Sequence, residues 1–99
     1  MTTNSDNLSV ENNEASNQFE VRLGEDLAFL TYEKRGSRII LQHTEVPKEM
    51  EGKGIGGKLA QSALDYARAQ NLKAVPLCPF VASYLNRHPE YEDTVVRES

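Results

Sequence analysis

EGKGIGGKLA, residues 51–60, holds four glycines and two lysines and leads directly into a helical pattern. Glycines ahead of a helix let the backbone approach a ligand closely, and the free N–H groups of a helix N-terminus attract anions. The stretch therefore predicts a phosphate-binding loop. Gly52, Gly54 and Gly57 satisfy G-x-G-x-x-G, and residues 52–58 satisfy the first seven positions of G-x-x-x-x-G-K-[ST]. These patterns belong to sites for different phosphate-bearing ligands, and the rest of the sequence is needed to choose between them.

Three runs upstream of the loop have the composition of β-strands. They are FEVRL (19–23), LAFLTYEK (27–34) and RIILQHTEV (38–46), and Pro47 ends the third. Short links between them predict an antiparallel meander.

Downstream of the loop, apolar residues recur at helical spacing from Ile55 to Gln70, and Asn71 is a candidate C-cap. LKAVPL (72–77) follows as a short buried strand, and PFVASYLNRH (79–88) as a short helix. A strand, a helix and a strand in succession predict that the third and fourth strands are parallel. The expected fold is α+β, in α/β layers, with the order β-β-β-α-β-α.

Composition limits the class of protein. The 99 residues suit one domain, and the net charge of −4 comes mainly from residues 1–17, which hold three carboxylates and no Lys or Arg. We expect that polar segment to be a flexible tail and residues 18–99 to form a single, nearly neutral domain, which argues against a nucleic-acid partner. A single cysteine and the lack of a long apolar run indicate a cytoplasmic protein without membrane or metal sites.

Two of the phosphate patterns fail on neighbouring residues. The G-x-x-x-x-G-K-[ST] loop needs a hydroxyl for magnesium where this chain has Leu59. A dinucleotide site needs an acidic residue about 20 positions on, and KAVPLCPF (73–80) has none.

A third pattern, Q/R-x-x-G-x-G/A between a strand and a helix, fits Gly54 and Gly56. It occurs in the GNAT superfamily of N-acetyltransferases. The run from His43 to Tyr91, with HTEVP, PLCPF and RHPEY, resembles small GNAT-like proteins of about one hundred residues, a minimal version of that fold. The chain departs from the pattern at Glu51, where Arg or Gln is usual. It departs again at Leu85, where a Tyr that serves as general acid is usual; Tyr84 lies one position away.

The resemblance implies that acetyl-CoA is the co-substrate and that no metal takes part. Its pyrophosphate would lie on the loop and the helix N-terminus. The residues expected to hold acetyl-CoA are Val46, Glu51, Gly52, Lys53, Gly54, Ile55, Gly56, Gly57, Lys58 and Arg87. A backbone N–H at Glu45 or Val46 would stabilise the oxyanion.

Three side chains are candidates for catalysis. His43 can exchange a proton near neutrality, but it shares strand parity with Ile39 and Leu41 and could be a core histidine. Glu45 could act as a base or orient another group. Cys78 precedes the last helix and could accept the acetyl group, or could simply be a small buried residue.

The leading hypothesis is an acetyl-CoA-dependent N-acetyltransferase that acts on an unidentified amine, as a monomer or weak homodimer. The alternative is a CoA-binding module with little or no transferase activity.

Overall fold

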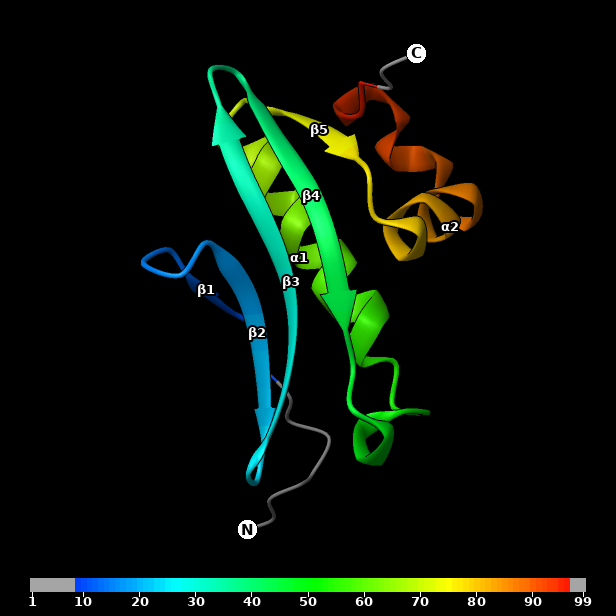
Figure 1. Cartoon of the computed structure of the whole chain (residues 1–99). Helices are drawn as coiled ribbons and strands as arrows, with labels where there is room; N and C mark the ends of the chain where they lie inside the picture. The colour runs from blue at the N-terminus through cyan, green and yellow to red at the C-terminus, as the bar shows by residue number, and fades with distance from the viewer. Residues whose placement is uncertain (1–8, 97–99) are drawn as a thin grey trace, which may run out of the picture.

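A computed structural model describes residues 9–96 as an α+β fold, in which helices pack on a sheet of five strands (Figure 1). Along the chain the elements are β1 (Glu11–Asn13), β2 (Gln18–Leu23), β3 (Asp26–Arg35), β4 (Arg38–Glu45), the 3-10 helix η1 (Lys48–Met50), α1 (Ile55–Ala69), β5 (Lys73–Pro76), α2 (Pro79–Arg87) and the 3-10 helix η2 (Pro89–Thr94). The predicted order of three strands, a helix, a strand and a helix is confirmed from β2 onward.

The sheet follows the chain, with the strand order β1-β2-β3-β4-β5. Neighbours from β1 to β4 are antiparallel, and β4 and β5 are parallel. Gly24 and Gly36 each have a φ of +62° in the turns that join β2 to β3 and β3 to β4. This left-handed conformation suits glycine and permits such tight turns. Both the antiparallel meander and the parallel last strand are as predicted.

β1 corrects the expectation for the N-terminal segment. We expected residues 1–17 to be a flexible tail, but Glu11–Asn13 pair with residues 18–20 of β2. The hydroxyl of Tyr32 donates a 2.7 Å hydrogen bond to Oδ1 of Asn12, which fixes β1 to a strand it does not adjoin. Partners elsewhere in the fold thus order a polar segment that has no strand signal of its own. Residues 1–8 lie outside the described part of the chain.

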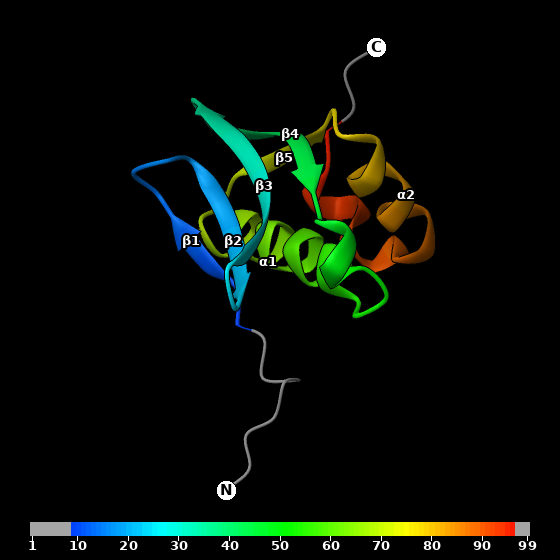
Figure 2. The same ribbon diagram turned by 60° about the horizontal axis from the view of Figure 1, so that its bottom comes forward.

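Helix α1 packs beneath the sheet and supplies much of the core (Figure 2). Its buried residues are the stripe that the sequence predicts, together with Gly56: Ile55, Gly56, Leu59, Ala60, Ala63, Leu64 and Ala67. The helix ends in a Schellman motif, in which the N–H of Leu72 reaches the carbonyl of Ala67 at 2.8 Å. Asn71, with a φ of +61°, is the left-handed residue of that motif, one position past the C-cap Gln70.

A β-bulge in β4 determines where the site lies. Leu41 pairs with Tyr32 and His43 pairs with Thr31, so Gln42 is an extra residue on β4. Such an insertion reverses which face each following side chain takes. The ladder to β5 ends at Leu41, whose carbonyl accepts from the N–H groups of both Leu77 and Cys78. β4 continues to Glu45 while β5 turns away, and the two strands part.

Candidate functional site

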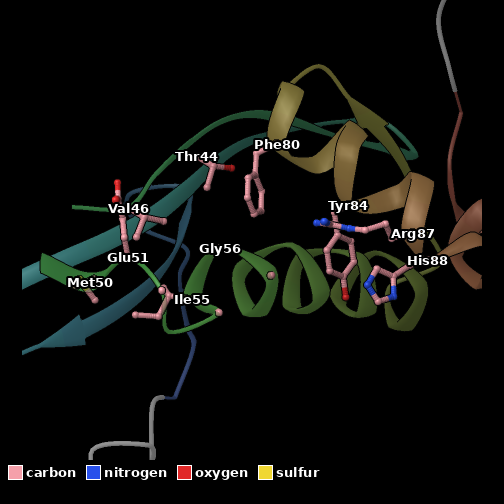
Figure 3. Close-up of a pocket in the computed structure, with 13 residues that line it drawn as sticks. Thr44, Val46, Met50, Glu51, Ile55, Gly56, Phe80, Tyr84, Arg87 and His88 are labelled. Atoms are coloured by element: carbon pink, nitrogen blue, oxygen red, sulfur yellow. The ribbon is translucent and has the colours of Figure 1, made fainter. Parts of the chain in front are cut away.

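A cavity of about 600 Å³ opens beside the end of β4 (Figure 3). Its walls come from β4, the glycine loop, the first turn of α1 and one side of α2. The lining residues are Thr44, Val46, Met50, Glu51, Gly52, Gly54, Ile55, Gly56, Gly57, Phe80, Tyr84, Arg87 and His88. The volume is typical of sites for small molecules and cofactors.

The glycine loop exposes backbone to this cavity. Gly52 and Gly54 have φ values of +84° and +72°, and no atom lies within 4 Å of the position that a Cβ would take at either residue. The first helical hydrogen bond of α1 runs from the N–H of Lys58 to the carbonyl of Gly54, at 3.1 Å. The N–H groups of residues 55–57 precede that bond, at the positive end of the helix dipole. This arrangement is suited to an anion.

The structure brings together most of the residues predicted to hold a cofactor. Val46, Glu51, Gly52, Gly54, Ile55, Gly56, Gly57 and Arg87 all line the cavity. Lys53 and Lys58 are exposed beside the loop and do not line it. Among the lining residues, Glu51 lies beside the loop, whereas Arg87 and His88 come from the C-terminal end of α2 (Figure 3).

His43 and Glu45 lie on the other face of the sheet from the cavity. Beyond the bulge, Thr44 and Val46 take the cavity side, and the alternation of a strand turns His43 and Glu45 away. Nε2 of His43 lies 3.1 Å from Oε1 of Glu45, and both side chains are about 60% exposed. The interpretation of His43 as a core residue in line with Leu41 is therefore wrong, because the bulge reverses its parity.

Cys78 is buried behind the wall of the cavity. It is 2% exposed and is the N-cap residue of α2. Its Sγ lies 3.2 Å from Oγ1 of Thr44, and Thr44, unlike Cys78, lines the cavity. The thiol is thus close to the site but separated from it by one side chain.

The aromatic side of α2 was missed by sequence reasoning. Phe80 and Tyr84 lie four residues apart on one face of α2, and His88, the residue just after the helix, follows four residues later. The rings of Tyr84 and His88 stack with centroids 4.0 Å apart, and Nδ1 of His88 lies 3.3 Å from Oε2 of Glu90. That spacing is visible in the sequence and is the signal that could have found these residues.

Burial raises the pKa of the Tyr84 hydroxyl, and the carboxylates of Glu90 and Asp65 raise it further. Arg87 opposes them by lowering this pKa. The net direction is upward, so Tyr84 keeps its proton at neutral pH and can donate it to a group in the cavity.

The described part of the chain shows neither a cluster of metal-binding side chains nor a membrane-spanning helix. Residues 9–96 contain no group of three or more His, Cys, Asp and Glu side chains that could hold a metal ion. Neither helix in this part of the chain is long and apolar enough to cross a bilayer.

Comparisons with known proteins converge on one family. Residues 18–94 match the model of the GCN5-related N-acetyl-transferase family. The chain is 42% identical over 85 residues to Protein NATD1 of Gallus gallus, covering 83% of this chain and 77% of that protein. It is also 42% identical to Protein NATD1 of Homo sapiens, covering 83% and 75%. The solution structure of a GCN5-like protein from Staphylococcus aureus superposes with a TM-score of 0.72 and 31% identity, covering 94% of this chain and 92% of that one.

Proposed function

Because the chain belongs to the GCN5-related N-acetyltransferase family, we propose that it binds acetyl-CoA in the cavity beside β4 and transfers the acetyl group to an amine. The main observation in support of this proposal is that two structural features meet at one cavity. The N-terminus of α1 and the part of β4 beyond its pairing with β5 both line the same cavity. When bound, acetyl-CoA supplies an activated acetyl group as a thioester.

The glycine loop fits the phosphate end of this ligand. Its backbone is open to the cavity at Gly52 and Gly54, and the first N–H groups of α1 point toward the same space. These donors are fixed by the fold, so they need no rearrangement to meet a pyrophosphate. Arg87, which reaches into the cavity from α2, is placed to pair with a further phosphate.

Tyr84 fits the role of proton donor. Acyl transfer from a thioester releases a thiolate, which needs a proton. Tyr84 is 7% exposed and lines the cavity, and the raised pKa of its hydroxyl keeps it protonated. The sequence departs from the family pattern at Leu85, and Leu85 is buried outside the cavity lining. We therefore assign the donor role to Tyr84.

The exposed pair His43 and Glu45 fits the role of base. The imidazole and the carboxylate are in contact at 3.1 Å, so a proton taken by one can be shared with the other. The backbone N–H of Glu45 or Val46, at the end of β4, is the candidate donor for the oxyanion. Direct transfer is favoured over a route through Cys78, because that thiol is buried behind Thr44.

Calorimetry and thermal shifts with acetyl-CoA, CoA, ATP and NAD test the ligand. A ligand at 100 times its dissociation constant adds about 2.7 kcal/mol to stability. We expect the two coenzyme A ligands to stabilise the protein and ATP and NAD to have little effect. Stabilisation by ATP or NAD alone would refute the proposal.

A panel of amines, with release of the CoA thiol as the readout, separates the two functions that the sequence left open. Thiol release that depends on an amine shows a transferase. Tight binding of acetyl-CoA, with no release of the CoA thiol in the presence of any of the amines, would instead show a binding module.

A further inference from the structure

The ring of Phe80 projects from the first turn of α2 into the middle of the cavity and points at Gly56 (Figure 3). A Cβ at Gly56 would lie 2.5 Å from Cζ of Phe80, and 3.0 and 3.1 Å from its two Cε atoms. Real Cβ atoms essentially never come within 3.0 Å of another atom, so the ring would have to move aside to admit one. The tip of the ring therefore occupies the space that any side chain at position 56 would need.

The other glycines of the loop have a different reason to be glycine. Gly52 and Gly54 need their positive φ, and the space beside each is open. Gly56 lies inside α1 and has no positive φ, so its backbone would accept alanine. A Cβ at Gly57 would make only an ordinary contact, 3.7 Å from Tyr84. The space beside position 56 is thus occupied by an aromatic ring.

We propose that the lack of a side chain at Gly56 makes room for the Phe80 ring. The ring, held in this place, forms an apolar wall against which the pantetheine chain of bound acetyl-CoA packs. The pair would make the cavity prefer an extended, phosphate-bearing ligand over a compact one with the same phosphates. This inference rests on the proposed binding of acetyl-CoA and assigns a specificity-determining role that the glycine motif does not contain.

The burial of Phe80 fits this role. The side chain is 38% exposed, so its tip is held by Gly56 while part of the ring remains open to the cavity. Apolar surface that is already fixed loses little conformational entropy when a ligand covers it. The phosphates would instead meet the N–H groups of α1 and the open backbone at Gly52 and Gly54, which Phe80 does not provide.

Comparing two ligands distinguishes the contribution of the Phe80 wall to binding from that of the phosphate site. CoA carries the chain, and 3′-phosphoadenosine 5′-diphosphate carries the same phosphates without it. By calorimetry, Phe80→Ala should weaken CoA binding about tenfold, equivalent to about 1.4 kcal/mol, and leave the compact ligand within about twofold. Gly56→Ala should show the same pattern, because its Cβ displaces the ring.

The double variant is the decisive measurement. If the ring is the reason for the glycine, Gly56→Ala should have no further effect on CoA binding once Phe80 is alanine. If the missing Cβ of Gly56 instead serves the close approach of the phosphates, Gly56→Ala would weaken the binding of both ligands, and by the same factor whether residue 80 is Phe or Ala. That result would overturn the inference. Leu77→Ala is the matched control, because Leu77 is an exposed apolar residue outside this cavity lining.

A double-mutant cycle measured by denaturation tests the contact between Gly56 and Phe80 without any ligand. Gly56→Ala should lower the denaturation midpoint when Phe80 is present and raise it when Phe80 is alanine, since alanine favours a helix over glycine. Equal shifts of the denaturation midpoint with Phe and with Ala at position 80 would show that the ring does not depend on Gly56. If the wild-type protein bound neither ligand, the proposed function would fail, and this cycle would still report on the contact.

Discussion

Replacing Glu51 with Gln should tighten the binding of CoA. Glu51 is an exposed carboxylate in the wall of the anion site, beside Gly52 and Gly54. The cationic side chain of the lining, Arg87, comes from α2 and lies on the other side of Phe80 from Glu51 (Figure 3). A pyrophosphate on the loop would therefore meet the negative charge of Glu51, which Gln removes at nearly constant shape.

The size of this effect follows from Coulomb's law. For a carboxylate about 8 Å from each phosphate charge and an effective dielectric constant of about 40–80, each pair repels by about 0.5–1 kcal/mol. Two such charges give about 1–2 kcal/mol, which salt at about 0.15 M cuts by more than half. Glu51→Gln should then tighten CoA binding about two- to fourfold at that salt concentration, and about four- to tenfold at about 0.01 M.

Titration calorimetry at the two salt concentrations is the assay. Glu49→Gln is the matched control, because Glu49 is an exposed carboxylate two residues away, in η1, and does not line the cavity. Affinity that rises equally in both variants would show a general effect of net charge. Unchanged or weaker binding in Glu51→Gln would refute the placement of the pyrophosphate beside this residue.

Three further substitutions test the chemistry and the stability of the fold. Tyr84→Phe should lower kcat about 100-fold and leave CoA affinity unchanged, because it removes a proton donor and keeps the ring; an unchanged kcat would exclude Tyr84 as the acid. Cys78→Ala should keep transferase activity within a few fold, and the unsubstituted protein should show no acetyl adduct at Cys78 by mass spectrometry; complete loss of activity in the variant would support the covalent route. Burial, together with a hydrogen bond to Asp65, raises the pKa of Tyr91 to about 12, above the value of about 10 for an unfolded chain. Its contribution to stability is thus complete below about pH 10 and is lost as the pH rises through about 12; urea unfolding of Tyr91→Phe should show a shallower fall over that range, and an equal slope would contradict this assignment.

The sequence predicts the elements whose signals are local and periodic. The stripe on α1 and the strands from β2 to β5 appear at nearly the expected residues, because burial on one face leaves a regular pattern. β1 leaves none, since Asn12 and its neighbours are held by β2 and by the hydroxyl of Tyr32. A strand made by its partners cannot be found from its own composition.

The same distinction applies to the site. The glycine loop is visible in the sequence because its function depends on backbone that only glycine allows at positions 52 and 54. The face taken by His43 is not visible, because one extra residue at Gln42 reverses it. Tyr84 was passed over because its place was judged from alignment to the family pattern, whereas its place in the cavity depends on how α2 packs against α1.

The bulge at Gln42 also makes the two catalytic hypotheses geometrically distinct. On the cavity side, Thr44 lies against the buried thiol of Cys78. On the other side, His43 and Glu45 face a surface that no helix of the described residues covers (Figure 1). A base on that surface can serve only an amine that approaches the gap between β4 and β5 from the open face. A thiol route requires the acetyl group to pass Thr44 on the cavity side. Substitutions of His43 and of Cys78 therefore probe opposite faces of one strand, and the variant that removes turnover identifies the face on which transfer takes place.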